Sequence, residues 1–311
     1  MTFLVIGSGA IGQRHAANLA VLGERAELIS WRSEGLAGIE AKLATNSFEA
    51  AFICTATQIR LPVIQLLANA NTPFYVEKPL AYAQNDLTAI TDTLGDLANR
   101  CFVGLMMRYH PALRFLHDQD LNAAYRFHFE IGHDVHQWRQ NWRFSDSYAA
   151  NPDGGGVLLD LCHELDMAHC LFPTATLGTV SALSHADHPK VDFATTATLQ
   201  GDHVQGSVSM DYISPVSHRN IALRGAGTCY DFDMAANRFS QRNGKTEVLH
   251  DLTIDRQVMF QNTMADFLRL IRGKRPQNPL APVLSQTLAS SALICQAYEM
   301  RNFTGQIGGT A

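Results

Sequence analysis

An apolar run, Phe3-Leu4-Val5-Ile6, leads into the glycine-rich segment Gly7-Ser8-Gly9-Ala10-Ile11-Gly12, and helical spacing follows over residues 11–22. The pattern G-x-G-x-x-G between a strand and a helix is typical of a dinucleotide-binding turn. Gly7 permits the tight turn, Gly9 lets the backbone approach a pyrophosphate, and Gly12 allows close helix–strand packing. The start of the helix offers free N–H groups and partial positive charge to phosphate. The alternative is a structural glycine turn that no longer binds a ligand. The predicted contacts are Gly7, Gly9, Ala10, Ile11 and Gly12.

The first hundred residues alternate between strand and helix patterns. Expected strands are 2–6, 26–30, 50–54, 74–76 and 101–104, and expected helices are 11–22, 61–70 and 86–98. Short apolar strands separated by helices predict a parallel sheet with helices on both faces. Right-handed crossovers then give a doubly wound, Rossmann-type α/β fold.

The pattern changes after about residue 108. Expected helices are 112–117, 154–171, 258–271 and 284–301, and expected strands include 125–131, 194–199, 204–210, 220–223 and 228–232. Runs of adjacent strands indicate an antiparallel α+β domain. We therefore expect a dinucleotide-binding Rossmann domain over residues 1–108 and a substrate-binding α+β domain over residues 109–311.

The composition restricts the class of protein. The 311 residues are 46% hydrophobic and 17% charged, which is enough apolar material for large packed cores. A net charge of −5 argues against a nucleic-acid or membrane-surface partner. The six cysteines form no C-x-x-C pair, so small buried side chains are expected rather than disulfides. No signal-peptide pattern and no apolar stretch near ~20 residues is present, so we expect a cytoplasmic protein.

The end of the second strand bears on the choice of dinucleotide. NAD selectivity usually places an acidic residue there, to bind the ribose 2′-hydroxyl. The sequence reads Leu28-Ile29-Ser30-Trp31-Arg32-Ser33, with Glu27 inside the strand and Glu34 beyond its tip. Arg32 could pair with a 2′-phosphate, and Ser30 or Ser33 could add a hydroxyl, which favours NADP over NAD. The alternative for Arg32 is an exposed loop cation.

A lysine follows the fourth strand directly, in Phe74-Tyr75-Val76-Glu77-Lys78-Pro79. Ligands of open α/β sheets bind at the carboxyl ends of the strands. Pro79 stiffens the turn, so Lys78 could face a nicotinamide and donate a proton to the reacting oxygen. We also expect cofactor contacts at this edge of the sheet from Thr55, Glu77 and Lys78.

A second group of polar residues lies in the segment from Gly154-Gly155-Gly156 to Asp166. On one helix, Asp160, His163 and Asp166 recur every three residues and lie near one face. His163 could exchange a proton with a substrate hydroxyl while a carboxylate orients it. A zinc site would need further ligands and has no supporting spacing pattern, so no metal is predicted.

These motifs together resemble the Gfo/Idh/MocA family, which is named for glucose–fructose oxidoreductase, inositol dehydrogenase and a rhizopine-catabolism protein. The resemblance covers essentially the whole chain. It implies a Rossmann domain followed by a domain built on a large, mainly antiparallel sheet that often supports dimers or tetramers. It also implies NAD(P)-dependent oxidation or reduction of sugars, cyclitols or related alcohols, with Lys78 and His163 as the catalytic pair and Asp160 beside them.

The chain departs from the family pattern at two places. Family members commonly separate the helix aspartate and histidine by four residues, whereas Asp160 and His163 are three apart. The loop after the third strand, Thr55-Ala56-Thr57-Gln58-Ile59-Arg60, carries an arginine where a histidine is common. We assign Arg60 no catalytic role.

The substrate contacts are expected from two further segments. Arg108-Tyr109-His110-Pro111 and the region from His136 to Tyr148 resemble a branch of the family found with surface-polysaccharide and nonulosonic-acid pathways. Guanidinium and aromatic groups there could line a sugar pocket, although Trp138 and Trp142 could also be ordinary core or interface residues. The predicted substrate contacts are Arg108, Trp138, Arg139, Tyr148 and Asp166.

The sequence thus predicts an NAD(P)-dependent oxidoreductase acting on a hydroxyl-bearing carbon of a sugar, cyclitol or nucleotide sugar. Two alternatives stay open. One is a non-catalytic NAD(P)-binding sensor, which would not need Lys78 and His163. The other is a glycoside-cleaving enzyme that uses tightly bound NAD without net turnover.

Overall fold

The structure, a computed structural model, describes residues 2–137 and 143–308. The chain forms two compact units that are each discontinuous in sequence. The first unit comprises residues 1–109 and 255–292, and the second comprises residues 110–254 and 293–311. The chain therefore returns to the first unit near its end, a feature that the expected boundary after residue 108 does not include.

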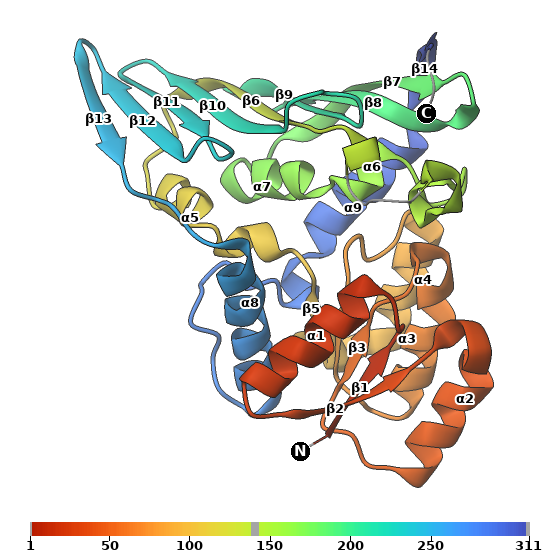
Figure 1. Ribbon diagram of the computed structural model, residues 1–311. Helices are drawn as coiled ribbons and strands as arrows, with labels where there is room; N and C mark the ends of the chain where they lie inside the picture. Colours follow the sequence, from red (N-terminus) through yellow and green to blue (C-terminus); the bar gives the residue numbers. More distant parts are fainter. Residues whose placement is uncertain (1, 138–142, 309–311) are drawn as a thin grey trace. The chain divides into compact units, whose positions relative to one another are not determined.

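The first unit contains a five-stranded parallel sheet in the order β2-β1-β3-β4-β5 (Figure 1). Its strands are β1 (Thr2–Ile6), β2 (Arg25–Ile29), β3 (Ala51–Ile53), β4 (Phe74–Val76) and β5 (Phe102–Val103). Its helices are α1 (Ala10–Val21), α2 (Trp31–Thr45), α3 (Arg60–Asn69), α4 (Gln84–Leu94) and α8 (Arg256–Ile271). The predicted doubly wound α/β architecture is confirmed. The strand order reverses at β1 and β3, which makes the carboxyl ends of these two strands the topological switch point.

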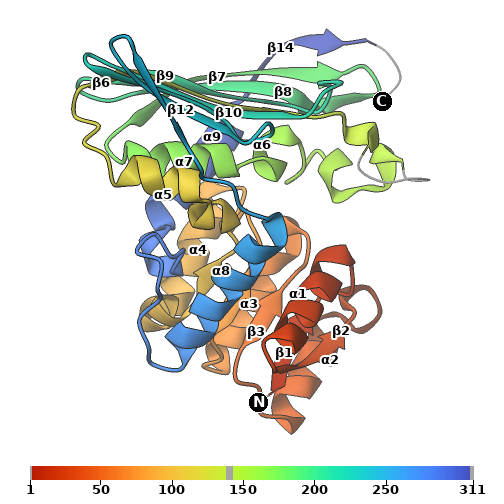
Figure 2. The same ribbon diagram turned by 60° about the vertical axis from the view of Figure 1, so that its left-hand side comes forward.

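Packing explains why α8 belongs to this sheet. Right-handed crossovers place α2, α3 and α4 on one face of the sheet and α1 on the other. Helix α1 alone would leave part of that second face of the sheet uncovered. Helix α8 lies beside α1 on that face (Figures 1 and 2). Apolar side chains from both sides meet in one buried cluster, namely Phe3, Val5, Leu19, Phe52, Tyr75, Phe102, Met264, Phe267 and Leu268.

Helix α2 was not expected from the sequence. Only Ile39 is buried along its length, and Gly35 breaks the regular helical geometry at a kink with φ 59°. A helix with one buried residue shows no apolar stripe, so its sequence lacks the periodicity that reveals a helix.

The second unit contains a nine-stranded sheet in the order β13-β12-β11-β10-β6-β9-β8-β7-β14. The strands are β6 (Ala124–Gly132), β7 (Thr176–His185), β8 (His188–Gln200), β9 (Gln205–Asp211), β10 (His218–Gly225), β11 (Thr228–Asp233), β12 (Arg238–Asn243), β13 (Thr246–His250) and β14 (Asn302–Ile307). Two neighbouring pairs, β6–β9 and β14–β7, are parallel and the other pairs are antiparallel. The predicted large, mainly antiparallel sheet is confirmed.

Helices cover one face of this sheet. Helices α5 (Pro111–His117), α6 (Val157–Asp160) and α7 (His163–Leu171) lie along it (Figures 1 and 2). Alternation along β6 matches this arrangement, because Phe127, Phe129 and Ile131 are buried while Arg126 is exposed. The remaining helix is α9 (Leu288–Glu299), and 3₁₀ turns occur at 57–59, 95–100, 106–109, 135–137, 144–146, 148–150 and 284–286.

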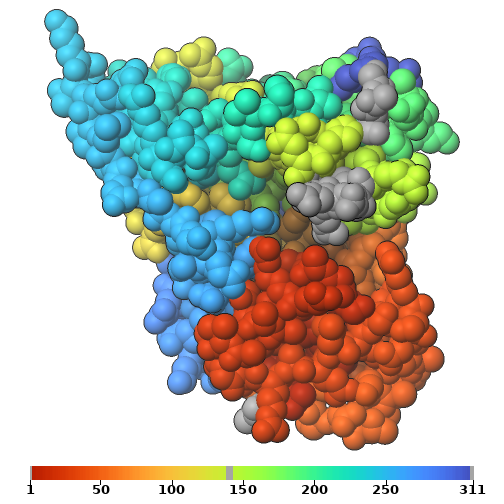
Figure 3. All heavy atoms as spheres, in the orientation of Figure 1, coloured from red at the N-terminus to blue at the C-terminus, as the bar shows by residue number. Residues whose placement is uncertain are grey.

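At one edge of this sheet the β12–β13 hairpin extends outward, as the space-filling view shows (Figure 3). Val248 and Leu249 on β13 are exposed. All six cysteines are free; Cys101, Cys162 and Cys295 are buried, and the other three are half-buried.

Across the two described ranges, we find no helix with both the length and the hydropathy needed to cross a bilayer.

The packing of α8 leads to a stability prediction. Phe267 is fully buried, with its ring centroid 5.5 Å from Phe52, 5.9 Å from Tyr75 and 5.6 Å from Phe102. Phe267→Ala is expected to lower the free energy of unfolding by about 3–5 kcal/mol, through lost burial and a residual cavity. Urea titration followed by circular dichroism measures this. Val258→Ala, at an exposed position on the same helix, should change it by less than about 0.5 kcal/mol. Equal effects of the two substitutions would show that α8 does not anchor on the sheet.

Candidate functional site

The glycine turn is held by close backbone contacts at the end of β1. Gly7 donates its N–H to the Ile29 carbonyl at 2.9 Å and has φ +115°. A Cβ on Gly12 would lie 1.8 Å from the Gly7 carbonyl oxygen, so no larger residue fits there without moving the turn. A Cβ on Gly9, in contrast, would meet no atom of residues 2–137 or 143–308 within 4 Å. The protein's own packing therefore requires Gly12 but leaves the backbone at Gly9 open to approach.

Helix α1 begins within this turn, at Ala10, with Gly9 as its N-cap. Among the residues that the structure describes, no side chain caps the helix, and no acidic residue lies in its first turn. The partial positive charge at the start of α1 is therefore not offset by a carboxylate of the first turn, which suits an anionic ligand.

The ends of β3 and β4 lie at the same edge of the sheet as the glycine turn. Cys54 donates its N–H to the Ile6 carbonyl at 2.8 Å, and Glu77 donates to the Ile53 carbonyl at 3.0 Å. Parallel pairing thus continues to the residues just before Thr55 and Lys78. The structure brings the predicted cofactor residues Gly7–Gly12, Thr55, Glu77 and Lys78 to one edge, at the switch point.

Arg60 ties the two loops at this edge together. Its side chain is 4% exposed and donates to the carbonyl oxygen of Thr55 at 3.0 Å and of Lys78 at 3.3 Å. It also donates to the carbonyl of Pro79, which follows a cis peptide bond. With its guanidinium bonded to three carbonyls, Arg60 acts as a structural tie between the loops.

Glu77 is buried and bonded to a residue that the sequence analysis did not single out. His15 on α1 donates from Nε2 to Oε1 of Glu77 at 2.7 Å. Burial by itself raises the pKa of the Glu77 carboxyl. The His15 hydrogen bond and the surrounding positive charges outweigh burial, so the pKa is lowered from its ordinary value. The only sequence signal for His15 was its place in the helix that follows the glycine turn.

The end of β2 is followed directly by α2, which places Arg32 and Ser33 in the first helical turn. The Ser33 hydroxyl donates weakly to the Ser30 carbonyl at 3.4 Å. Glu27 pairs with Lys42, so its carboxylate is engaged away from the strand tip. Arg32 is exposed, and no ion pair involves it within the part of the chain that the structure describes.

In the second unit, Asp160 is the last residue of α6 and His163 is the first residue of α7. The prediction of one continuous helix from 154 to 171 is wrong, because the backbone leaves helical geometry at Leu161, with φ −105° and ψ 25°. Asp160 and His163 therefore flank a helix break rather than share a helix face. Each is 9% exposed.

Aromatic and imidazole groups surround Asp160. The Tyr148 hydroxyl donates to its carboxylate. Burial, followed by the Asp160 carboxylate, raises the pKa of Tyr212 well above its ordinary value. Burial lowers the pKa of His133, although Asp160 opposes this effect. The structure thus brings the predicted residues Tyr148 and Asp160 together. The sequence analysis did not identify Tyr212 and His133, because the segments of the second unit that contain them carry no recognisable motif.

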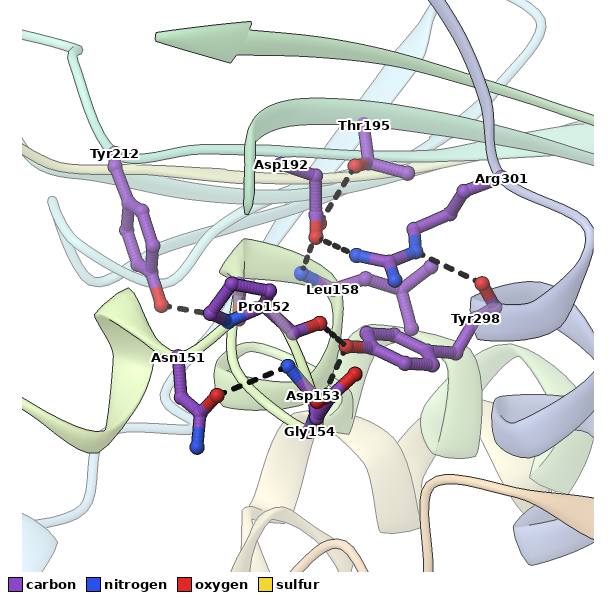
Figure 4. A network of polar contacts seen from close by, with 11 residues as sticks. Asn151, Pro152, Asp153, Gly154, Leu158, Asp192, Thr195, Tyr212, Tyr298 and Arg301 are labelled. Carbon is purple, nitrogen blue, oxygen red and sulfur yellow. Dashed lines mark hydrogen bonds and ion pairs between the residues drawn. The ribbon is translucent and has the colours of Figure 1, made fainter. Parts of the chain in front are cut away.

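A buried network holds the glycine triplet that precedes α6 (Figure 4). Asp192 is fully buried and accepts hydrogen bonds from Leu158 N–H at 2.9 Å, from Thr195 at 2.9 Å and from Arg301. A Cβ on Gly156, which has φ +96°, would lie 2.0 Å from Oδ1 of Asp192. The Asp192 carboxylate therefore occupies the space that only a glycine leaves at the start of α6.

The same network continues to the other end of the triplet (Figure 4). The Arg301 guanidinium lies 3.3 Å from the Tyr298 ring centroid. The Tyr298 hydroxyl accepts from Gly154 N–H at 2.9 Å and donates to the Pro152 carbonyl at 2.9 Å. Asp192, Tyr298 and Arg301 thus position the turn that leads to Asp160. Single polar residues on separate strands and helices give no sequence pattern, which is why the sequence analysis missed them.

The other predicted substrate residues have separate surroundings. Asp166 is fully buried in α7, and its burial does not support the predicted contact with the substrate. Arg108 belongs to the first unit and is buried, with its guanidinium 3.4 Å from the Ser290 hydroxyl. Trp138 and Arg139 lie outside the described residues. Lys78 belongs to the first unit and His163 to the second, so their catalytic pairing stays a prediction.

Over residues 2–137 and 143–308, no group of three or more His, Cys, Asp or Glu side chains is arranged to hold a metal ion.

The chain was compared with known proteins by sequence. No protein-family model matches it. A curated relative, 4-carboxy-2-hydroxymuconate-6-semialdehyde dehydrogenase from Sphingobium sp. strain SYK-6, is 27% identical over 134 residues. That match covers 38% of this chain and 42% of the relative.

Solved structures match over nearly the whole chain. An oxidoreductase from Agrobacterium radiobacter, in complex with NAD⁺, L-tartaric acid and magnesium, has a TM-score of 0.76 at 14% identity and covers 96% of both chains. Levoglucosan dehydrogenase with NADH and L-sorbose has a TM-score of 0.76 at 15% identity, covering 96% of this chain and 95% of that one. UDP-N-acetylglucosamine 3-dehydrogenase from Acidithiobacillus ferrooxidans has a TM-score of 0.74 at 19% identity, with coverages of 96% and 95%. At these identities the similarity establishes the fold.

The buried Asp192–Arg301 pair can be tested by a double-mutant cycle. Arg301→Met is expected to lower the free energy of unfolding by about 3–5 kcal/mol, because it leaves the buried Asp192 carboxylate without its cation. Asp192→Asn added to Arg301→Met should recover part of this loss, since the amide carries no charge. Urea titrations of the wild type, both single variants and the double variant measure the coupling. Strictly additive losses would show that the two side chains do not stabilise each other.

Proposed function

We propose that the protein is an NAD(P)-dependent oxidoreductase of the Gfo/Idh/MocA type. It would transfer a hydride between the nicotinamide and a hydroxyl-bearing carbon of a sugar, cyclitol or nucleotide sugar. The observation that carries the proposal is the geometry at the switch point, where an uncapped helix start, an open Gly9 backbone and Lys78 lie at one sheet edge. The resemblance of the motifs and the fold shared with sugar dehydrogenases support it.

The residues at this edge fit a dinucleotide. The backbone of Gly9 and the first N–H groups of α1 would hold the pyrophosphate, because no side chain of the described residues crowds or caps them. The loop that begins with Thr55 would lie beside the nicotinamide half, since ligands of this fold lie across the reversal of strand order. Hydride donation and acceptance would be the chemistry that a bound dinucleotide supplies.

The chain's own residues would handle the hydroxyl proton. Lys78 would donate a hydrogen bond to the reacting oxygen and take up or release its proton. His163 would serve as the second acid–base group, with Asp160 beside it and Tyr148 holding the Asp160 carboxylate. The triplet network of Asp192, Tyr298 and Arg301 would keep Asp160 in place.

NADP is the dinucleotide that we favour. Arg32 stands in the first turn of α2, just past the end of β2, and Glu27 is engaged by Lys42. A guanidinium at that place suits a 2′-phosphate, and Ser33 would add a hydroxyl. The similar structures that name a dinucleotide contain NAD⁺ or NADH, so NAD is the alternative.

The substrate class follows from the resemblance and from the neighbours. Levoglucosan dehydrogenase and UDP-N-acetylglucosamine 3-dehydrogenase share the fold, and their names describe a sugar and a nucleotide sugar as substrates. Arg108, Tyr148 and Asp166 are the described residues that the sequence predicts as substrate contacts. Arg108 and Asp166 are buried whereas Tyr148 is exposed, so Tyr148 is the contact that we favour. A homodimer or homotetramer is expected from the family resemblance.

Calorimetric titration of the cofactor-stripped protein with NADP(H) and NAD(H) tests the proposal first. Binding of one of them should be followed by turnover in a panel of sugars, cyclitols and nucleotide sugars, with a carboxylated semialdehyde included because of the curated relative. Binding without turnover of any panel member would favour a sensor. Absence of binding would rule out the proposed function.

Substitution of the predicted catalytic residues should separate binding from turnover. Lys78→Ala and His163→Ala are each expected to lower kcat by roughly 10²–10⁴-fold while dinucleotide binding persists, because each removes an acid–base group. Steady-state kinetics and calorimetry measure the two effects. Lys245→Ala and His117→Ala, at exposed positions outside the proposed site, serve as controls. Turnover like the wild type in either test variant would exclude that residue from the mechanism.

The dinucleotide preference can be tested at Arg32. Arg32→Ala should weaken NADP binding by roughly 10- to 100-fold, since a charge-assisted hydrogen bond is worth about 1.5–3 kcal/mol, and should leave NAD binding nearly unchanged. Arg25→Ala, at the other end of β2, is the matched control. Equal losses for both dinucleotides in Arg32→Ala would contradict the assignment of a 2′-phosphate contact.

A further inference from the structure

A buried polar pair joins two segments of the first unit that are far apart in sequence. His15 lies on α1, in the turn after the glycine motif, and Glu77 immediately precedes Lys78. Their side chains are 2.7 Å apart from Nε2 to Oε1, and the two residues are 1% and 9% exposed. A buried carboxylate is costly unless it is paired and hydrogen-bonded, so this contact must form whenever the unit is folded.

The His15 ring is fixed by its neighbours. Its centroid lies 5.0 Å from that of Tyr75, 5.4 Å from Phe52 and 6.0 Å from Phe260. Three aromatic rings from two strands and α8 leave the imidazole little freedom to rotate. Its Nε2 therefore meets the carboxylate in one orientation.

Glu77 is equally restricted. A Cβ on Gly104, the residue after β5, would lie 3.1 Å from Oε2 of Glu77. The backbone of Glu77 is bonded to Ile53, and Arg60 holds the carbonyls of Lys78 and Pro79. The peptide that carries Lys78 is thus held by Arg60 through its backbone and by His15 through the preceding side chain.

The charges around Glu77 come from several elements. Its neighbours are His15 on α1, Arg60 on α3, Lys78 in the same loop, Cys54 after β3 and Tyr75 on β4. Burial raises the pKa of Cys54 and of Tyr75 well above their ordinary values, so both are neutral and Glu77 is the anion of the group. An anion beside Lys78 favours the protonated amine.

We propose that His15 is a positioning residue that acts through Glu77 on Lys78, so that α1, which carries the glycine turn, also sets the position and charge of the lysine. This inference rests on the proposed function, which assigns Lys78 its role as an acid–base group. His15 itself is buried, at 1% exposure, and would act only through Glu77. By holding the Glu77 carboxylate, it fixes where that negative charge lies relative to the Lys78 amine.

Competitive chemical labelling of the Lys78 amine, followed across pH by peptide mass spectrometry on the full-length protein, tests the proposal. The measured quantity is the midpoint pH of labelling. Glu77→Gln should lower this midpoint by about 1 pH unit, because it removes the neighbouring negative charge. His15→Phe keeps the ring but removes the hydrogen bond, so the carboxylate should turn to Lys78 and raise the midpoint.

Two further variants complete the design. His15→Gln keeps a side-chain donor and should restore a midpoint close to that of the wild type. If His15→Phe does not fold, His15→Leu replaces it, because leucine also lacks a donor and should also raise the midpoint. Asn18→Ala removes another buried polar side chain of α1, which accepts from Gln257 on α8, and should leave the midpoint unchanged.

Opposite shifts for Glu77→Gln and His15→Phe support the proposal. Shifts in the same direction, or no shift in either variant, would overturn it and leave His15 a purely structural residue. In steady-state kinetics both variants should lower kcat more than they change dinucleotide affinity. The labelling needs neither substrate nor cofactor. Failure of the wild type to turn over any substrate would therefore count against the proposed function alone.

Discussion

The contact between Gly12 and the Gly7 carbonyl is the constraint on which the first unit depends. Because a Cβ on Gly12 would overlap that oxygen, helix α1 can approach the end of β1 only with glycine there. This approach sets the start of α1 at the switch point and carries His15 to the buried carboxylate of Glu77. One steric condition in the first dozen residues thus determines both a surface suited to phosphate and the surroundings of Lys78.

In the second unit a buried carboxylate, rather than a backbone carbonyl, lies against the glycine that precedes the helix. Asp192 fills the space that Gly156 leaves, and it binds the first turn of α6 through the Leu158 N–H. Arg301 neutralises that carboxylate and packs on Tyr298, which holds Gly154. In each unit a glycine lets another group approach so closely that a Cβ would overlap it: the Gly7 carbonyl at Gly12, and the Asp192 carboxylate at Gly156. In each unit, too, a buried ionic contact lies close to a predicted catalytic residue.

Local patterns predicted much of this architecture. The glycine turn identified the parallel sheet, and Glu77-Lys78-Pro79 was correctly expected after the fourth strand. The sequence could not reveal α2, since a helix with one buried residue has no apolar stripe. The break between Asp160 and His163 was also missed, because Leu161 and Cys162 suit a helix and only tertiary packing interrupts it. The roles of three further residues come from contacts with partners that are remote in the chain, and a single sequence does not show such pairings. These residues are Asp192, Arg301 and His15.

The discontinuity of the first unit has a consequence for biosynthesis. The face of the sheet that carries Phe52, Tyr75 and Phe102 is closed by α8, which begins only at residue 256. A ribosome will therefore have made the entire nine-stranded sheet apart from β14 before the first unit can bury its own aromatic core. The first unit, which holds the earliest segment of the chain, is thus completed only after most of the second unit has been made. During that interval the apolar surface of the sheet stays uncovered, and surface of this kind makes incompletely folded chains prone to aggregation.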